Sequence, residues 1–326
     1  EMMQENITSQ NKKMLFIVAP NKNSLYDYMP SNYRKSKDKS NWERLSQKMS
    51  NVSYIDAFDL FRSKKECYYY KTDTHWNDQG AYLLVEKAMD LLGRPLLDQK
   101  EPAVFEKNAM TGDLQRMLYP DSKPNESKLV LGNPQYQMIT TTRSFEQPYI
   151  ETNQPNGNGS LVMFRDSFAN NMITHLSEQY QYAIYDKNIP YNLSAVDKYQ
   201  ADHVIIEIAE RNLNLIQEYK PLFLSPERET LSGKVINNLV KEIKTEQKND
   251  WIQITGILNK NEIDEDSRVY LKVNGKTVEL IPQKIDGDEY GFCGYVLKDQ
   301  FVKSVEVIAE SVHGGKLISS GIVLLK

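Results

Sequence analysis

The sequence predicts an α/β domain with a largely parallel sheet flanked by helices, followed by a small C-terminal antiparallel β-sandwich. The chain has 326 residues, enough for about two domains. Short apolar runs alternate with helical periodicity from residue 12 to about residue 224, whereas beyond residue 250 apolar residues recur at every second position. We therefore expect domains at residues 1–228 and 251–326, joined by a helical connector at residues 229–250.

Four apolar runs in the first domain predict buried strands. They cover residues 14–18, 161–164, 182–185 and 204–208. A helix is predicted from the N-cap residue Asn77 to Leu92, because its apolar residues share one face and Gly93 can end it. We expect two more helices, one at residues 42–49 and one directly after the strand that ends near Phe164.

The remaining regions are predicted from their composition and period. Six prolines divide residues 101–160 into short pieces, which indicates loops and an antiparallel excursion. Lys, Glu and Asn surround a few apolar residues between residues 225 and 250, which favours an exposed helix. Period-two runs predict strands at residues 251–258, 269–273, 278–280, 290–297, 302–309 and 317–324.

Charge and apolar content exclude several classes of protein. Forty basic and 44 acidic residues leave a net charge of −4 without a long block of one sign, so we expect no nucleic-acid partner. No apolar stretch approaches the ~20 residues that span a bilayer. Because the chain begins at Glu1, we expect that an N-terminal signal or anchor has been removed.

Cys67 and Cys293 have neither metal nor redox spacing. Two separate buried thiols are the favoured interpretation, although their pairing stays open.

The four histidines differ in their surroundings. His313 precedes two glycines and is expected in a solvated turn, and His203 directly before a strand is expected to be structural. His175 lies about two helical turns beyond Ser167, too far along the helix to reach its hydroxyl. His75 follows Asp73 by two residues in an irregular segment, where a carboxylate can fix the tautomer of the ring.

Ser167 is the candidate nucleophile. It follows a predicted strand that turns at once into a helix, and the carboxyl end of a parallel sheet is where open α/β folds bind ligands. The free N–H groups of a helix start can hold an oxyanion, and His75, oriented by Asp73, can take the serine proton. Helix capping by Asp166 and Ser167 is the alternative interpretation of this turn.

Four short motifs together resemble a known family. They are residues 73–76 (DTHW), 111–114 (TGDL), 166–168 (DSF) and 207–211 (EIAER), and residues 18–22 (VAPNK) also fit its early strand. In this order they resemble the SGNH-hydrolase-like proteins of exopolysaccharide O-acetylation, which include AlgJ, AlgX and the DHHW proteins. The resemblance covers roughly residues 12–215.

The resemblance implies a role for each matching residue. Ser167 would be the nucleophile that accepts the acyl group, His75 the general base and acid, and Asp73 its orienting partner. It also implies secretion, anchoring to the outer face of a membrane through a segment absent from this chain, and cooperation with a membrane-bound O-acyltransferase. Arg165 is a departure, since ordinary SGNH enzymes have Gly before Asp-Ser.

Five further residues are candidates for contact with substrate or oxyanion. Arg165 either contacts an anionic or hydroxyl-rich substrate or forms a salt bridge behind the sheet, and Trp76 either stacks on a sugar or packs in the core. Gly112 would offer a backbone N–H to the oxyanion unless the segment is a plain helix cap. The side chain of Asn170 either points inward or faces solvent, and Arg211 either contacts substrate or pairs with Glu210.

These residues predict an extracellular O-acetyltransferase or acetylesterase that acts on an exopolysaccharide or cell-wall glycan through an acetyl-serine intermediate. The aromatic residues of the second domain suit either glycan binding or a core. No carboxylate or histidine cluster has metal-ligand spacing, so neither metal nor cofactor is expected. The alternative function is a noncatalytic polysaccharide-binding or scaffold protein of the same secretion machinery.

Overall fold

The computed structural model describes most of the chain. The described residues are 1–26, 38–97, 103–131, 133–141, 144–229, 231–248, 251–261, 263, 267–285, 289–298, 304–311, 315–319 and 322–323. They form two compact units, one of residues 7–219 with Glu1 and one of residues 220–326 with residues 2–6. Among the described residues, no helix combines the length and the apolar character that crossing a bilayer requires.

A seven-stranded sheet forms the centre of the first unit. Its strands in spatial order are β2 (Tyr54–Ile55), β1 (Lys13–Ala19), β9 (His203–Ala209), β7 (Ser160–Phe164), β8 (Tyr182–Asp186), β6 (Tyr149–Asn153) and β5 (Gln137–Met138). The first five are parallel, and β6 and β5 are antiparallel to their neighbours. The predicted largely parallel sheet is therefore present, with an antiparallel edge.

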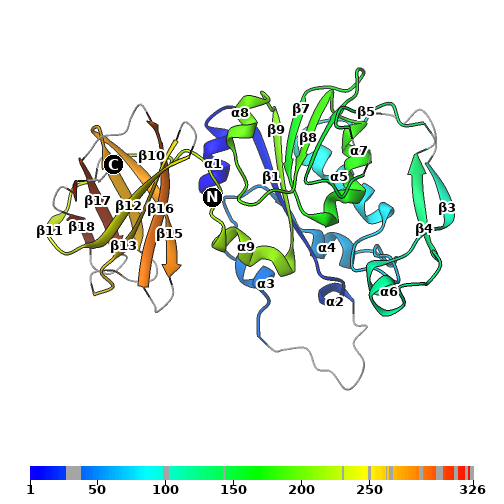
Figure 1. Ribbon diagram of the computed structural model, residues 1–326, viewed down its shortest axis with the longest axis horizontal. Helices are drawn as coiled ribbons and strands as arrows, with labels where there is room; N and C mark the ends of the chain where they lie inside the picture. The colour runs from blue at the N-terminus through cyan, green and yellow to red at the C-terminus, as the bar shows by residue number, and fades with distance from the viewer. Residues whose placement is uncertain are drawn as a thin grey trace. The chain divides into compact units, whose positions relative to one another are not determined.

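Helices cover both faces of this sheet. The main ones are α4 (Ala57–Arg62), α5 (Asp78–Leu91), α7 (Asn170–Ser177), α8 (Ser194–Lys198) and α9 (Leu213–Glu218). Figure 1 shows α5 and α7 on one side of the sheet and α8 and α9 on the other. Alternate residues of β1, such as Leu15 and Ile17, pack with the apolar faces of α5 and α7 in one buried cluster. Burying such faces removes apolar surface from water, which is the main stabilising contribution to the fold.

The predicted helix at residues 77–92 is confirmed. The side chain of Asn77 accepts a hydrogen bond from the backbone N–H of Gly80, and the helix gives way to Gly93 in the left-handed conformation at φ 72°. The helix expected after Phe164 begins as a 3₁₀ turn, η1 (Ser167–Ala169), before α7 continues it. The predicted helix at residues 42–49 is α3 (Asn41–Ser46), with a complete capping box.

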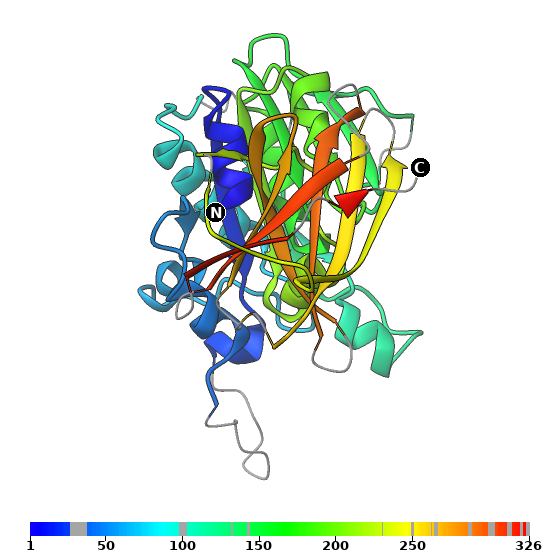
Figure 2. The same ribbon diagram turned by 90° about the vertical axis from the view of Figure 1, so that its left-hand side faces the viewer.

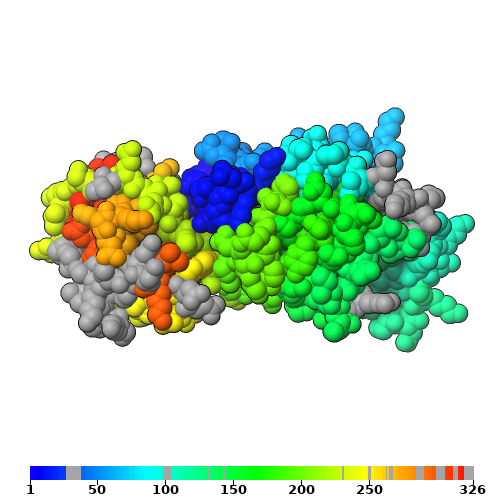
Figure 3. Space-filling view, turned by 90° about the horizontal axis from the view of Figure 1, so that it is seen from above, coloured from blue at the N-terminus to red at the C-terminus, as the bar shows by residue number. Residues whose placement is uncertain are grey.

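Several short elements surround the carboxyl ends of the parallel strands. They are α2 (Lys22–Leu25), η2 (Glu210–Asn212), α6 (Asp113–Leu118), and the hairpin of β3 (Ala103–Met110) and β4 (Glu126–Leu131), whereas α1 (Met2–Thr8) precedes β1 in the chain. In Figure 1, α2 and α6 lie at the lower end of the unit, toward which β1 and β9 run. Figure 3 looks onto its opposite end, where segments that precede the parallel strands form the surface.

The second unit is one continuous antiparallel sheet rather than two separate sheets. Its main path runs β11 (Lys234–Ile236), β18 (Gly315–Ser319), β17 (Ser304–Ser311), β14 (Arg268–Val273), β15 (Lys276–Ile285), β16 (Glu289–Leu297), β13 (Trp251–Leu258) and β12 (Val240–Lys248), with β10 (Glu227–Arg228) on β15 and β19 (Ile322–Val323) on β17. Among the strand pairs that the structure describes in this sheet, only β11 and β18 are parallel. Figure 2 shows the sheet curling, and residues from both of its halves, such as Ile254 and Val307, share one buried core.

The predicted helical connector is wrong. Residues 229–250 contain β11 and β12, and the second unit begins near Lys220. β12 pairs with β13 along its whole length as the last strand of the sheet. A strand of an antiparallel sheet can keep one face in water, and edge strands often carry charged side chains. The Lys and Glu residues of β12 therefore give it the same composition as a solvated helix. Leu239, directly before it, is fully buried in the core of the sheet.

Candidate active site

The turn that carries Ser167 is held by Asp166. One oxygen of the Asp166 carboxylate accepts a hydrogen bond from the backbone N–H of Phe168 at 2.9 Å, which is the capping role expected of such a turn. The second oxygen accepts hydrogen bonds from the backbone N–H of Ala209 at 2.8 Å and from Nδ2 of Asn212 at 2.9 Å. Asp166 thus fastens the serine turn to the carboxyl end of the neighbouring strand β9.

The structure brings Asp73, His75 and Ser167 together. His75 Nε2 lies 2.8 Å from Ser167 Oγ, and His75 Nδ1 lies 2.6 Å from Asp73 Oδ1. The same Asp73 oxygen accepts the backbone N–H of His75 at 2.8 Å, which fixes the loop between them. The side chain of Asp73 is 5% exposed and that of His75 is 21% exposed. The imidazole therefore joins a buried carboxylate to a hydroxyl that solvent can reach.

The Asp73 carboxylate is stabilised in its charged form. Burial raises the pKa of Asp73, but hydrogen bonds from the His75 ring, the His75 backbone N–H and the Asp113 backbone N–H outweigh it, and the pKa lies below its ordinary value. Asp73 Oδ2 accepts the Asp113 N–H at 2.7 Å. An ionised Asp73 favours a proton on Nδ1 of His75 and leaves Nε2 free to accept the serine proton.

Residues from other elements hold the loop that carries Asp73 and His75. Lys22 Nζ, at the start of α2, donates to the backbone oxygens of Tyr70 at 2.6 Å and Lys71 at 2.9 Å. Glu126, at the start of β4, accepts from the backbone N–H of Thr72 at 2.5 Å and from its hydroxyl at 2.7 Å. Sequence reasoning gave no role to Glu126, and Lys22 entered it only as part of a matching strand motif.

Gly112 has a packing role at this site. It is the N-cap residue of α6, and a Cβ atom there would lie 2.0 Å from the backbone oxygen of Thr72. No larger residue fits without displacing the Thr72 backbone. The close approach lets α6 donate the Gln115 N–H to that oxygen at 3.2 Å and the Asp113 N–H to Asp73. A role of Gly112 as an oxyanion donor stays a prediction.

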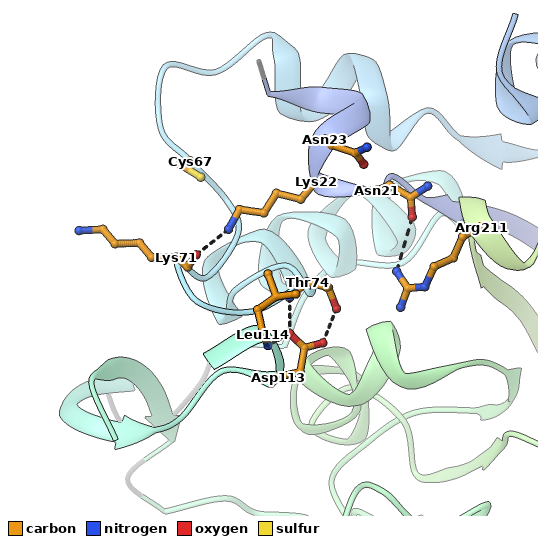
Figure 4. A pocket seen from close by; sticks show the side chains of 9 residues that line it. All are labelled: Asn21, Lys22, Asn23, Cys67, Lys71, Thr74, Asp113, Leu114 and Arg211. Carbon is orange, nitrogen blue, oxygen red and sulfur yellow. Dashed lines mark hydrogen bonds between the residues drawn. The ribbon is translucent and has the colours of Figure 1, made fainter. Parts of the chain in front are cut away.

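A cavity adjoins the triad. It has a volume of about 930 Å³, and Figure 4 shows the side chains around it. The lining residues are Asn21, Lys22, Asn23, Cys67, Lys71, Thr74, Asp113, Leu114 and Arg211. Thr74 and Asp113 lie next to the triad, since Asp113 contacts both Asp73 and His75, but the triad residues themselves are not among the lining residues. Most of the lining surface is apolar, and a few lysine, arginine and amide groups among it could bind polar groups of a ligand.

Both sequence interpretations of Arg165 are wrong. Its side chain is buried, and its guanidinium donates to the backbone oxygens of Phe145 and Gln147, both at 3.0 Å, and to Asn170 Oδ1 at 2.6 Å. Burial lowers the pKa of Arg165 to about 10, while the nearby Glu207 opposes that shift. No salt bridge of Arg165 is present among the described residues. The long side chain satisfies partly buried carbonyl groups beneath the serine turn instead of facing a substrate.

Trp76 and Asn170 also face the protein rather than a ligand. Trp76 is fully buried and packs edge-on against Phe168 with ring centroids 5.1 Å apart, so it is a core residue and not a sugar-stacking surface. The amide of Asn170 is bound by Arg165 and donates to Glu146 Oε1 at 2.7 Å. The neighbouring Asn171 donates to the backbone oxygen of Trp76 at 2.9 Å, which links α7 to the histidine loop.

Arg211 is the candidate substrate residue that the structure leaves accessible. It is exposed and lines the cavity, and its guanidinium lies 4.9 Å from the centre of the Phe168 ring. The expected pair with Glu210 is absent, because Asn21 lies between the two. Glu210 accepts the Asn21 N–H at 3.1 Å, and Arg211 donates to the Asn21 side-chain oxygen at 3.5 Å (Figure 4 shows the latter).

Glu207 is a buried acid beneath the serine turn. It is fully buried in β9 and accepts the backbone N–H of Asp166 at 3.1 Å. Burial, and next the nearby Asp166 carboxylate, raise the pKa of Glu207 well above its ordinary value, against the opposing effects of hydrogen bonds from Asp166 and Ala169 and of the Arg165 charge. The fold therefore favours the protonated form of Glu207. The helix-start N–H groups of Phe168 and Ala169 are engaged by Asp166 and Glu207, which leaves fewer of them for an oxyanion.

The remaining histidines lie apart from the triad. His175 is buried in α7 with its ring against Tyr82, and burial lowers its pKa to about 4. His203 begins β9 at the end opposite to Asp166, and burial lowers its pKa to about 4 as well. The prediction for His313 falls outside the described residues.

The two cysteines are free, and one is in an unexpected place. Cys293 is buried, as expected, but Cys67 is exposed and lines the cavity. Phe292 and Tyr295, which were candidates for a glycan-binding surface, are buried in the second unit. Trp251 is half-buried there, with its ring 6.0 Å from that of Tyr295. Phe292 and Tyr295 are therefore closed to a sugar, and glycan binding by the second unit stays a prediction.

Three donor groups of the site have a spacing that permits a metal ion. Donor atoms of Asp73, His75 and Asp113 all lie within 4.8 Å of one another. A cation held there would compete with the hydrogen bond between Asp73 and His75, because both would use the same Nδ1 and carboxylate oxygen. The arrangement therefore fits a hydrogen-bonded triad better than a metal centre.

Comparison with known proteins agrees with this geometry. Residues 1–152 match the family model described as "SGNH hydrolase-like domain, acetyltransferase AlgX". We call the first unit, which contains most of the matched residues, the AlgX-like domain because of this similarity. The matched residues of the AlgX-like domain include Asp73 and His75 and end before Ser167, and the resemblance inferred from the four motifs is confirmed. No curated protein matches the chain in sequence.

Two solved structures with TM-scores above 0.5 share the fold of the AlgX-like domain. A DHHW family protein from Eubacterium siraeum DSM 15702 is 15% identical with a TM-score of 0.52, covering 65% of this chain and 84% of that one. Bacillus cereus PatB1 with a sulfonyl adduct is 16% identical with a TM-score of 0.51, covering 65% and 85%. The O-acetyltransferase domain of Pseudomonas putida AlgJ is 16% identical with a TM-score of 0.41, covering 64% and 79%.

Proposed function

We propose that this protein is an extracellular SGNH-type serine O-acetyltransferase or acetylesterase that acts on an exopolysaccharide or cell-wall glycan. The observation that carries the proposal is the 2.8 Å contact between His75 Nε2 and Ser167 Oγ, with Asp73 on the second ring nitrogen. A serine hydroxyl becomes an effective nucleophile only when a base accepts its proton, and this arrangement supplies one. The AlgX-like domain supports acetyl as the transferred group.

The proposed reaction has two halves. Ser167 Oγ attacks the carbonyl carbon of an acetyl ester while its proton passes to Nε2 of His75. The tetrahedral intermediate collapses, the imidazolium gives that proton to the leaving oxygen, and acetyl-serine remains. A glycan hydroxyl or water then attacks the acetyl-serine and gives its proton to His75, and Ser167 leaves with a proton from the imidazolium. Asp73, held ionised by three hydrogen bonds, stabilises the imidazolium in both halves.

The cavity is the proposed acceptor site. Thr74 and Asp113 form its wall on the side of the triad, and Arg211 lies across from them in Figure 4. A glycan there would place a hydroxyl near Ser167, whereas an open, hydrated cavity would favour hydrolysis. Transfer and hydrolysis use the same triad, and water exclusion decides between them.

The proposal includes a partner and a location. The acetyl donor would be a membrane-bound O-acyltransferase that delivers acetyl groups to the outer face of the membrane, and this protein would be anchored there. A pull-down of the full-length protein from detergent-solubilised membranes, with and without Ser167→Ala, tests that partnership. Recovery of no such acyltransferase would remove it from the proposal.

A sulfonyl fluoride that modifies activated serines tests the nucleophile directly. We expect phenylmethanesulfonyl fluoride to add one sulfonyl group to Ser167, detected by mass spectrometry of the digested protein, and the adduct in the PatB1 structure motivates this reagent. His75→Ala should slow the labelling, since the serine proton then has no acceptor. Unlabelled Ser167, together with equal ester hydrolysis by the wild type and Ser167→Ala, would favour the noncatalytic scaffold.

A further inference from the structure

Asp113 presents a second carboxylate to the histidine of the triad. Asp113 Oδ2 lies 3.6 Å from His75 Nδ1, the nitrogen that also contacts Asp73 Oδ1 at 2.6 Å. The side chain of Asp113 is 28% exposed and faces the cavity, whereas that of Asp73 is 5% exposed. One ring nitrogen thus faces a buried carboxylate and a partly solvated one.

Hydrogen bonds hold both the side chain and the backbone N–H of Asp113. Its Oδ1 accepts the backbone N–H of Thr74 at 2.8 Å, and its Oδ2 accepts the Thr74 hydroxyl. Its own N–H donates to Asp73 Oδ2 at 2.7 Å. α6 can approach this closely because Gly112 has no side chain to meet Thr72. The carboxylate therefore does not have to be ordered when charge develops on His75, and preorganised groups are the ones that stabilise a transition state efficiently.

Two other charged groups near His75 are cations, and they oppose a positive charge on its ring. Arg211 lies over the Phe168 ring, whose centre is 4.6 Å from that of His75, and it brings a positive charge to that side. Lys22 Nζ contacts the backbone oxygen of Asp73 at 3.4 Å. These two cations partly offset the stabilisation that the Asp73 carboxylate gives to the His75 imidazolium. The negative charge of Asp113 compensates for that loss.

We propose that Asp113 is a positioning residue that holds Asp73 through its N–H and stabilises the imidazolium of His75 through its charge. This inference rests on the proposed function for its catalytic consequence. It goes beyond helix capping, because a cap would be equally served by a neutral side chain. Asp113→Asn keeps a carbonyl oxygen for the Thr74 N–H and keeps the backbone N–H to Asp73, so it removes mainly the charge.

The test is the pH profile of kcat/KM for hydrolysis of p-nitrophenyl acetate. In Asp113→Asn we expect the acidic limb to move to lower pH by about 0.5 to 1 unit and kcat to fall by about 3- to 10-fold, with KM unchanged. Asp121→Asn, the same change at an exposed position beyond α6, should leave the profile in place. An acidic limb at the wild-type pH in Asp113→Asn would overturn the inference.

A second measurement does not depend on turnover. The His75 ring signal, identified as the one lost in His75→Ala, can be titrated by NMR in the wild type and in Asp113→Asn. We expect the midpoint to be lower in Asp113→Asn by the same amount as the shift in the kinetic profile. Absence of turnover in the wild type would remove the proposed function alone, whereas equal midpoints would overturn the role of Asp113 alone.

Discussion

Nε2 of His75 lies 2.8 Å from Oγ of Ser167, although 92 positions separate the two residues in the chain. The histidine is on an irregular loop before α5, and the serine is on a turn after β7. The loop is held by groups from α2, α6 and β4, and the turn is held by β9. The contact is therefore a product of the whole AlgX-like domain, and the expectations below follow from it.

Ser167→Ala should abolish ester hydrolysis and leave the fold intact. Its hydroxyl contacts His75 at the surface of the site, so its removal opens no large internal cavity. We expect kcat for p-nitrophenyl acetate to fall by about 10⁴-fold or more, by analogy with serine proteases. Circular dichroism of the variant should match the wild type. An unchanged rate would show that another group performs the hydrolysis.

Asp73→Asn should reduce kcat with little change in KM. An amide on Nδ1 no longer favours the tautomer that leaves Nε2 free, and it cannot stabilise an imidazolium. Loss of about 10³- to 10⁴-fold is expected, since the corresponding change in serine proteases is of that order. Asp59→Asn, at an exposed position on α4, is the matched control. A loss of less than tenfold would contradict the orienting role of Asp73.

Gly112→Ala should displace the loop that carries the triad. The added Cβ would meet the Thr72 oxygen at 2.0 Å, so either α6 or residues 72–75 must move. Overpacking of this kind costs about 1–3 kcal/mol in the free energy of unfolding. We expect lower stability in urea together with a fall in kcat, and neither effect in Arg116→Ala on the exposed face of the same helix. Wild-type stability of Gly112→Ala would contradict this close approach.

Glu207→Gln should change how stability depends on pH. Because the folded state raises the pKa of Glu207, its contribution to stability is fully present below the unfolded pKa near 4.3 and is lost as pH rises toward the folded pKa. The wild type should therefore lose up to about 1.4 kcal/mol per pH unit from this group over that interval.

The measurement is urea unfolding at pH 5 and pH 8. Glutamine carries no titrating proton, so the stability of Glu207→Gln relative to the wild type should increase between the two pH values. Glu86→Gln, on the exposed face of α5, should show no such change. A pH-independent difference between Glu207→Gln and the wild type would argue that Glu207 is ionised in the folded state.

Arg165→Met should destabilise the AlgX-like domain rather than weaken substrate binding. It leaves the partly buried backbone oxygens of Phe145 and Gln147 without this donor, and an unsatisfied group costs up to about 1–3 kcal/mol when it is fully buried. We expect a lower unfolding midpoint in urea and an unchanged KM for polysaccharide in the fraction that remains folded. A raised KM with normal stability would restore the substrate role predicted from the sequence.

The sequence was sufficient where the evidence is local. The helix at residues 77–92, the buried strands and the alternating strands after residue 250 follow from the period of apolar residues, which repeats every few positions. Asp73 and His75 lie two positions apart, so their pairing is also local. The connector at residues 229–250 was mistaken because a strand with one wet face and a solvated helix share the same charged composition.

The sequence by itself determined an α/β unit before a β unit, the element that carries each triad residue, and the motifs typical of an AlgX-like domain. The tertiary structure alone decided that Arg165 and Trp76 face inward and that Asn170 binds Arg165 and Glu146. It also decided that Asp113, Lys22 and Glu126 hold the histidine loop. The physical reason is that burial and hydrogen-bond partners depend on segments far apart in the chain. The sequence gives the chemical nature of each side chain, but tertiary packing determines the direction in which the side chain points.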